Sequence, residues 1–431
     1  MTTTSKNIET LVLHGGTYRS DSATNAVAVP IYQTTSYQFD STEHAGKLFA
    51  LQEMGNIYTR IMNPTTQVLE ERLAALEGGM AALAVASGSS AVALAIQNLA
   101  SAGDNIVASP HLYGGTYNLF KNTLRQMGIE VRYADPSDPS SFAALSDART
   151  RAYFGETLPN PQLVPFPIAE VAAIGKPLGI PLIVDNTAAP ITCRPLDHGA
   201  AIVVHSLTKF IGGHGTSIGG VIIDGGTFDW LAKPLQQPNL NTPDDSYHGA
   251  VWGELVPQAL GAPIAYIVRA RVVLLRDLGA ALSPTNAFYL IQGLETLALR
   301  FREHQANAQK LANYLSEHQA VASVIYPGLF EGDDKSLVTK YLNKGHGALV
   351  GIELKGGNEA GLKLINNLQL IYHVANIGDA RTLAIHPAST THSQLSAAEQ
   401  LQAGVTPGYI RFSVGIEHID DIIADIEQAL A

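Results

Sequence analysis

The sequence predicts an α/β protein with a large domain built on a mostly parallel sheet and a smaller C-terminal α+β domain. Between about residues 63 and 283, short continuous apolar runs alternate with helical stretches. This pattern is typical of a parallel sheet that is covered by helices on both faces. After residue 283 the pattern changes to one long helical stretch followed by strand and helix segments. A chain of 431 residues is also too long for one ordinary core, so we expect it to divide into domains.

Each part of the chain carries its own signal. Residues 1–62 are rich in Thr, Ser, Tyr and Asn with little periodicity, so we expect an extended arm with short turns. The large domain, 63–283, opens with a helix that has Asn63 as N-cap, Pro64 at its first position and Gly78 at its end. The elements expected after it are helices at 89–103, 115–128 and about 168–179, and strands at 105–109, 129–134, 151–157, 180–187, 200–208 and 219–224. The small domain, 284–431, should contain a helix through 302–318, strands near 321–328 and 347–354, and a closing strand and helix at 409–431.

Composition limits the possible partners. Hydrophobic residues make up 46% of the chain and charged residues 15%, which is typical of a globular protein. A formal net charge of −11 argues against nucleic acid as the main partner, because phosphate binding needs a basic face. With one cysteine, Cys193, the chain can form no intrachain disulfide and no zinc site of several thiolates. The histidines show no spacing typical of a metal site, so we expect no metal.

The N-terminus and the apolar runs indicate the location. The opening residues lack the apolar core of a signal peptide, and no run approaches the ~20 apolar residues of a membrane helix. We therefore expect a cytoplasmic protein with no membrane partner.

Two predicted strands end in chemically useful residues. Asp185 ends one apolar run, and the next run ends in Ser206, Thr208 and Lys209. In parallel sheets ligands bind beyond the carboxyl ends of the strands, so Asp185 and Lys209 can face one pocket. A buried Asp185 without a cationic partner would be costly, which indicates a ligand that supplies the positive charge. The alternative for Lys209 is a loop lysine that points to water.

This combination suits a cofactor with a phosphate, an aromatic ring and an aldehyde. The phosphate needs backbone N–H groups and hydroxyls, the ring a flat partner, and the aldehyde an amine. Residues 86–91, ASGSSA, offer free N–H groups where a helix opens, and Tyr113 sits in a flexible turn where its ring could lie on a ligand. The glycine-rich run 212–220 precedes a strand instead of opening a helix, which excludes a dinucleotide loop.

Five motifs give these features a family context. YTRIMNPT, ETLPNP, LIVDNT, SLTKFIGGH and IHPASTTH follow one another along nearly the whole chain. Together they resemble the Cys/Met-metabolism family of pyridoxal-phosphate (PLP) enzymes. The resemblance implies the fold type I, aspartate-aminotransferase-like architecture of PLP-dependent transferases, with PLP as the cofactor.

The resemblance also implies site residues. Lys209 would carry PLP and later move protons, Asp185 would pair with the pyridinium nitrogen, and Tyr113 would stack on the ring and assist protonation near the leaving group. It further implies that the phosphate is held by Gly88, Ser89, Ser206 and Thr208, and the phosphate of the neighbouring subunit's cofactor by Tyr58 and Arg60. The substrate would be bound by Arg411, Asn376 and Tyr58, and Asn160 would contact both cofactor and substrate. Without the resemblance, Tyr58 and Arg60 could be surface residues of the arm, Arg411 an ordinary strand-end charge, and Glu156 a satisfied polar residue.

The implied reaction follows from details within the family. The chain length, the run NIGDARTL and the insertion between about residues 224 and 249 are similar to members that convert O-acetyl-L-homoserine and sulfide to L-homocysteine and acetate by γ-replacement. The alternatives are a γ-lyase acting on methionine or cystathionine, a sulfhydrylase using O-acetylserine or another acyl-homoserine, and a non-catalytic scaffold. Gly115, where the methionine-lyase pattern has cysteine, weighs against a lyase. The resemblance implies a homotetramer built from dimers that share active sites.

One residue is a candidate for choosing between these reactions. The related lyases carry glutamate where this chain has Arg381. We expect the Arg381 guanidinium to repel the distal ammonium of cystathionine and to tolerate a small anion such as hydrosulfide. The alternative is that Arg381 faces solvent.

Overall fold

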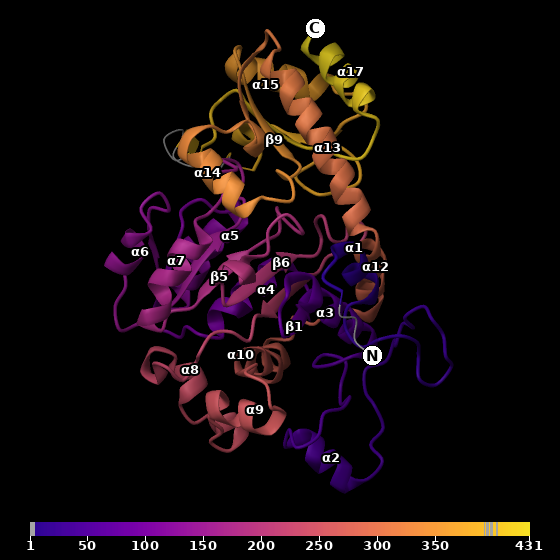
Figure 1. Ribbon diagram of the computed structural model, residues 1–431, viewed down its shortest axis with the longest axis vertical. Coiled ribbons are helices and arrows are strands. Elements are labelled where there is room, and N and C mark those ends of the chain that lie inside the picture. The colour runs from indigo at the N-terminus through magenta and orange to yellow at the C-terminus, as the bar shows by residue number, and fades with distance from the viewer. Residues whose placement is uncertain (1–4, 392, 394–395, 397–399, 402–403) are drawn as a thin grey trace.

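The largest element of the structure, a computed structural model, is a seven-stranded sheet (Figure 1). The structure describes residues 5–391, 393, 396, 400–401 and 404–431. The strand order is β1-β7-β6-β5-β4-β2-β3. β7 runs antiparallel to both of its neighbours, and the other pairs are parallel, which confirms the mostly parallel sheet. The strands are β1 (Ala81–Val85), β2 (Asn105–Ala108), β3 (Glu130–Tyr133), β4 (Thr150–Glu156), β5 (Leu182–Asp185), β6 (Ile202–Ser206) and β7 (Gly220–Asp224).

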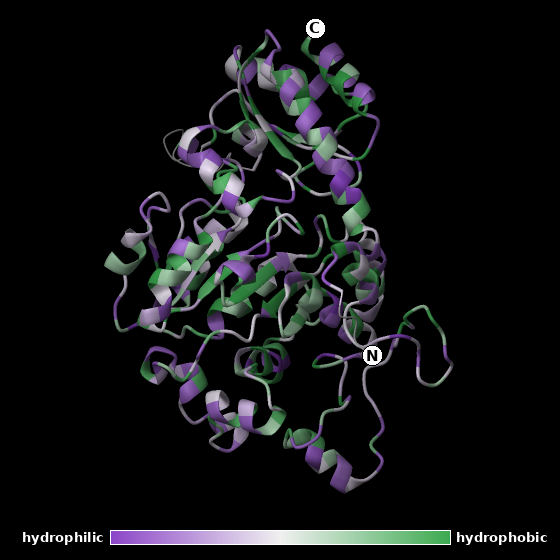
Figure 2. Cartoon of the chain, viewed as in Figure 1, coloured by the Kyte–Doolittle hydropathy of each residue, from purple (hydrophilic) through white to green (hydrophobic). Residues whose placement is uncertain are grey.

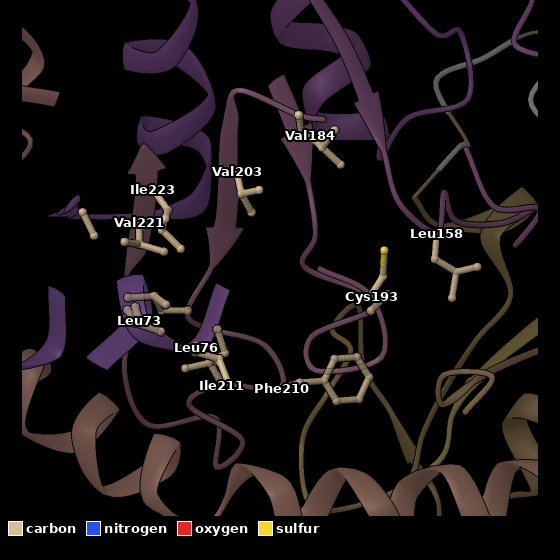
Figure 3. Close-up of a cluster of buried hydrophobic side chains, with 14 of the residues drawn as sticks. Leu73, Leu76, Leu158, Val184, Cys193, Val203, Phe210, Ile211, Val221 and Ile223 are labelled. Carbon is tan, nitrogen blue, oxygen red and sulfur yellow. The ribbon is translucent and has the colours of Figure 1, made fainter. Parts of the chain in front are cut away.

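Helices cover both faces of this sheet because its strands are apolar on both sides. One face packs against α3 (Pro64–Glu77), α7 (Ile168–Gly175) and α12 (Pro284–Glu295), and Figure 3 shows part of this core, with Leu73, Val203, Phe210 and Ile223. The other face packs against α4 (Gly88–Gln97) and α10 (Ala265–Arg269). α3 begins and ends as predicted: the Asn63 side chain accepts the Thr65 N–H, and Gly78 has a positive φ of 75°.

Three local predictions needed correction. The arm is not only extended, because it contains α1 (Ile8–His14) and α2 (Thr42–Phe49). The strand β1 was not predicted, because three of its five residues are alanine, a strong helix former, so the run resembles the helix that follows it. The predicted helix at 115–128 is α5 (Gly114–Asn118) continued by a π-helical segment, Leu119–Leu124.

A second, five-stranded sheet lies at the top of Figure 1. Its strand order is β10-β11-β12-β9-β8. The helices α13, α15 and α17 show alternating polar and apolar bands in Figure 2, and their apolar faces form a separate core with this sheet. Its elements are β8 (Val321–Ile325), β9 (Leu349–Leu354), β10 (Tyr372–His373), β11 (Leu383–Ile385), β12 (Tyr409–Ser413), α13 (Leu297–Ser316), α14 (Gly332–Tyr341), α15 (Gly357–Asn367) and α17 (Ile419–Leu430). The boundary expected at residues 283/284 stays a prediction; α12, directly after it, packs against α3.

The remaining helices lie below the large sheet in Figure 1 or at its edge. They are α6 (Ser140–Ala144), α8 (Pro238–Asn241), α9 (Trp252–Leu260) and α11 (Arg276–Leu278). Among the described residues, no single helix combines the length and apolar character needed to cross a membrane; a sharply bent pair, Trp252–Leu260 with Ala265–Leu278, meets those two requirements only jointly.

Candidate active site

The loop that carries Lys209 is held rigidly. It follows β6, and its apolar residues Leu207 and Phe210 are fully buried. The guanidinium of Arg300, from α13, donates hydrogen bonds to the carbonyl oxygens of Phe210 (2.8 Å) and Ile211 (3.1 Å). Because two anchored residues flank it, Lys209 can project from the end of the sheet in a defined direction.

The Lys209 amine lies in a partly buried, electropositive position. Its Nζ donates a hydrogen bond to Oδ1 of Asn376 at 2.5 Å. Burial, and next the charge of Arg411, lower the pKa of Lys209 to about 8. A larger share of this amine is therefore neutral near neutral pH than for an ordinary lysine, as a nucleophile or base requires.

Asp185 lies at the end of the neighbouring strand, as predicted. The registers of β5 with β6 and of β4 with β5 place Asp185 opposite Val204 and Glu156. One Asp185 oxygen accepts the N–H of Thr187 at 2.9 Å, and burial raises the pKa of the carboxyl. No ion pair with a lysine or arginine is found for Asp185 in the described part of the chain. A cationic ring nitrogen would supply the missing partner.

The N-terminus of α4 forms a narrow cradle with the end of β6. A Cβ on Gly88 would lie 2.5 Å from Cβ of Ser206, and one on Gly220 would lie 2.1 Å from the carbonyl oxygen of Ser87. Only glycine fits at these approaches. Ser89 is exposed beside Gly88, so backbone N–H groups and the Ser206 side chain share one small space at the positive end of a ten-residue helix. Thr208 is the exception, because its hydroxyl pairs with the N–H and carbonyl of Gly219.

Tyr113 caps the start of α5 with an exposed ring. Its exposed fraction is 55%, and its backbone N–H donates to Oε1 of Glu156 at 2.7 Å. Gly115 lies directly against that ring, since a Cβ there would lie 2.4 Å from Cε1 of Tyr113. Any side chain at position 115 therefore requires the ring to move.

Arg411 enters the same region from the second sheet. It lies on β12 and is buried, with an exposed fraction of 7%. Its Nη2 donates to the carbonyl oxygen of Asn376 at 2.9 Å, and its buried Nε has no hydrogen-bond partner in the described chain. Burial lowers the pKa of Arg411, and no carboxylate within ion-pair distance compensates its charge among the described residues. This is the expected state of a guanidinium that awaits an anionic ligand.

Asn376 and Asn160 complete the set. Asn376 contacts Lys209 with its side chain and Arg411 with its carbonyl, so it joins the two cations. Oδ1 of Asn160 is buried and has no hydrogen-bond partner among the described residues, which leaves an acceptor free for a ligand.

Two predicted residues lie elsewhere in the same chain. Tyr58 and Arg60 lie on the arm, where the Arg60 guanidinium stacks over the Tyr58 ring at 5.1 Å. Both line a cavity of about 410 Å³ between the arm and residues 279–284. No contact in the described chain connects them with Lys209, Asp185 or Arg411.

The structure weighs against the repulsion predicted for Arg381 and favours the alternative, a side chain that faces solvent. Its guanidinium forms a two-pronged ion pair with Asp379, through Nε at 2.8 Å and Nη2 at 2.9 Å. About half of the side chain is exposed, and it lies over the ring of Tyr372. Because the charge is compensated and solvated, it exerts little repulsion on a substrate ammonium.

These residues fit pyridoxal phosphate. The amine with a lowered pKa matches the aldehyde, and the buried carboxylate without a cationic partner matches the ring nitrogen. The helix N-terminus with its glycine cradle matches the phosphate, and the arginine with a free buried Nε matches a substrate carboxylate. Two useful residues were not predicted to act here. Glu156 has the sequence signal of an ordinary polar residue at a strand end, and Arg300 lies 91 positions from Lys209, so no local signal connects Arg300 with the site.

Similarity to known proteins agrees with this site. The model of the family described as "Cys/Met metabolism PLP-dependent enzyme" matches residues 9–431. The chain belongs to this family. Its members' cofactor, PLP, is therefore the cofactor of this enzyme, and the predicted α/β fold of the family is confirmed.

Individual members of the Cys/Met metabolism family match over nearly their full length. The chain is 55% identical to O-acetyl-L-homoserine sulfhydrylase of Leptospira meyeri, covering 98% of this chain and 96% of that one. It is 49% identical to homocysteine synthase of Schizosaccharomyces pombe, covering 99% and 98%.

A solved structure of a family member shows the same fold. A putative O-acetylhomoserine (thiol)-lyase of Campylobacter jejuni, crystallised with N'-pyridoxyl-lysine-5'-monophosphate, matches with a TM-score of 0.93 and 44% identity, covering 98% of this chain and 99% of that one. Cystathionine gamma-lyase of Lactobacillus plantarum, complexed with L-serine, matches with a TM-score of 0.82 and 30% identity, covering 98% of each chain.

Proposed function

We propose that this enzyme converts O-acetyl-L-homoserine and sulfide to L-homocysteine and acetate. The observation that carries the proposal is the 55% identity, over nearly the whole of both chains, to a protein named O-acetyl-L-homoserine sulfhydrylase. The site supports it, since a lysine amine and an unpaired buried arginine suit an amino-acid substrate. The cystathionine gamma-lyase matches at the lower identity of 30%, so a lyase activity is the weaker candidate.

The residues of the site divide the work of binding. When bound, PLP supplies an aldehyde carbon that bonds to an amine and a pyridinium ring that takes up the electron pair released at the substrate Cα. The Lys209 Nζ would hold the cofactor, and Asp185 would hold a proton at the ring nitrogen. The remaining contacts are Tyr113 against the ring, Gly88, Ser89 and Ser206 at the phosphate, and Asn160 beside the ring. Thr208 would join the phosphate contacts if its hydroxyl turned from the Gly219 carbonyl to the phosphate.

The same residues would direct the substrate and its protons. Arg411, with Asn376, would bind the substrate carboxylate through its free Nε and fix Cα next to Lys209. The freed Lys209 amine would remove the Cα proton and later return it, and the Tyr113 hydroxyl would hold a proton near the leaving group. A Cβ proton would leave next, and the electron pair left at Cβ would expel acetate as the Cγ–O bond breaks. The sulfur of hydrosulfide would then form the new bond at Cγ, and Cβ would regain a proton. The atoms and charge of hydrosulfide and O-acetyl-L-homoserine thus equal those of L-homocysteine and acetate.

A turnover assay with a panel of substrates tests this function. Acetyl, succinyl and phospho-homoserine and O-acetylserine would each be supplied with sulfide, and cystathionine and methionine without it. We expect the highest kcat/KM for O-acetyl-L-homoserine with sulfide. A higher kcat/KM for cystathionine or methionine cleavage would overturn the proposal in favour of a lyase.

The pH dependence of cofactor capture follows from Lys209. Only a neutral amine attacks an aldehyde, and the pKa of Lys209 is lowered to about 8. After PLP is removed, the rate at which the protein captures it again should rise with pH to a plateau, with a midpoint near pH 8. Below the midpoint the rate should fall about tenfold per pH unit, because the neutral fraction does. Stopped-flow absorbance measures this rate, and a rate that does not change across the midpoint would contradict the lowered pKa.

We propose further that the active enzyme is a cytoplasmic homotetramer of dimers that share active sites. Support comes from Tyr58 and Arg60, which lie on the arm and line a separate cavity in their own chain. A phosphate of the neighbouring subunit's cofactor would give the exposed Arg60 guanidinium an anionic partner.

Hybrid oligomers test the sharing. Arg60→Ala should weaken PLP binding without unfolding the chain, because Arg60 is exposed. An equal mixture of Arg60→Ala and Lys209→Ala chains should recover up to about a quarter of the wild-type activity, since half of randomly formed dimers are hybrids with one intact site of two. Lys209→Ala mixed with Arg411→Met is the matched control. Lys209 and Arg411 come from one chain, so no hybrid site is intact. No recovery with Arg60→Ala, once hybrids are demonstrated, would exclude shared sites.

A further inference from the structure

Glu156 is a buried carboxylic acid that the proposed mechanism does not use. It is the last residue of β4, and its exposed fraction is 8%. The parallel register pairs it with Asp185, the last residue of β5, so the two carboxyl groups leave the sheet side by side at the same edge. Glu156 is therefore next to the group that would hold the ring nitrogen.

A second contact joins Glu156 to the other ring partner. Its Oε1 accepts the backbone N–H of Tyr113 at 2.7 Å, at the residue where α5 begins. The Tyr113 ring is largely exposed, and its carbonyl oxygen accepts the Tyr117 N–H within the first turn of α5, so in the described chain the bond to Glu156 is what ties Tyr113 to the sheet. One side chain thus adjoins both Asp185 and the turn that carries Tyr113.

The two carboxyl groups differ in what supports a negative charge. Neighbouring buried carboxylates cannot both ionise at low cost, so one keeps its proton. Asp185 accepts the Thr187 N–H at 2.9 Å, and the nearby His205 also favours its ionised form. Within the described chain, Glu156 has the Tyr113 N–H as its one favourable contact, and burial followed by the charge of Asp185 raises its pKa well above the usual range. No lysine, arginine or histidine acts on it among the described residues.

We propose that Glu156 is a positioning residue that works as the neutral acid: it anchors the Tyr113 turn and leaves the negative charge of the pair on Asp185. The inference rests on the proposed function, because Asp185 and Tyr113 matter here as partners of the PLP ring. In this arrangement Glu156 sets the geometry of both without touching cofactor or substrate.

Replacement by glutamine separates a neutral acid from a carboxylate. Glu156→Gln has the same shape, remains neutral at every pH, and keeps an oxygen for the Tyr113 N–H. We expect it to bind PLP with a Kd within about twofold of wild type, and the pH midpoint of the bound cofactor's absorbance to stay within a few tenths of a unit, because no charge is removed. Glu156→Ala, which loses the anchor, should raise the PLP Kd at least about tenfold.

The outcomes are decisive because the controls separate stability from binding. Asp224→Asn changes a buried carboxylate at the opposite end of the sheet, on β7, and should leave the PLP Kd unchanged. If Glu156→Gln binds PLP as poorly as Glu156→Ala, or moves the absorbance midpoint by a unit or more, Glu156 is ionised and the inference is overturned. A wild-type Kd for Glu156→Ala would overturn it as well, and Glu156→Gln alone decides if Glu156→Ala does not fold. Wild-type protein that captures no PLP would instead overturn the proposed function itself.

Discussion

Lys209→Ala is expected to abolish turnover, with kcat lowered by at least about a thousandfold. The variant loses the amine that would hold PLP and move the Cα proton, and no other lysine is placed at the ends of β5 and β6. The side chain is only partly buried, and its one hydrogen bond among the described residues goes to Asn376, so the fold should persist. Activity assays, with circular dichroism to confirm folding, measure both outcomes.

Borohydride reduction identifies the attachment point directly. Reduction of the wild-type enzyme should fix the pyridoxyl group on Lys209, as peptide mass spectrometry would show. Lys176→Ala, an exposed lysine that follows α7, serves as the control and should keep both label and activity. A label on Lys176 or on any other lysine would contradict the assignment.

Arg411→Met is expected to lower kcat/KM for the amino-acid substrate strongly while leaving the protein at least as stable. Losing one partner of a buried, hydrogen-bonded charge pair costs about 2–5 kcal/mol, or roughly 30-fold to 5,000-fold in kcat/KM. In the absence of substrate, however, the arginine is a buried charge without a carboxylate partner, and an apolar side chain of similar length relieves that cost.

The measurements and controls for Arg411 follow from this contrast. Steady-state kinetics should show the loss for the amino-acid substrate and an unchanged KM for sulfide, and urea unfolding should show an equal or higher free energy of unfolding. Arg411→Lys should recover part of the loss, since it restores the charge without the fork of the guanidinium. Arg302→Ala removes an exposed arginine from α13 and should change neither kcat/KM nor the free energy of unfolding. An unchanged kcat/KM in Arg411→Met would show that Arg411 does not bind the substrate.

The large sheet and much of the site could be predicted because their signals are local. Continuous apolar runs that end in Asp185 and in Ser206–Lys209 define strands whose carboxyl ends must meet, and β5 and β6 do pair. The N-cap and glycine signals defined α3 at both ends. Such patterns depend on a few neighbouring residues, so tertiary packing does not change them.

The errors arose where the partner of a side chain is distant or easily confused. The sequence shows that Asp379 lies two residues from Arg381. It does not show that the two side chains pair and leave the guanidinium half exposed. The contact of Arg300 with Phe210 depends on how α13 lies against the Lys209 loop. Glu156 at a strand end looks like any polar residue until the strand register places it opposite Asp185.

The Arg300 contacts have a consequence for protein engineering. A designer who wants a different sulfur donor would naturally vary the loop after Lys209, because its glycines look like free space. A Cβ on Gly213 would lie 2.0 Å from Nη1 of Arg300, and one on Gly378 would lie 2.4 Å from the backbone nitrogen of Phe210. Libraries that randomise 213 or 378 would thus consist mainly of variants that displace the lysine. Residues 210–213, Arg300 and Gly378 are best inherited together as one block.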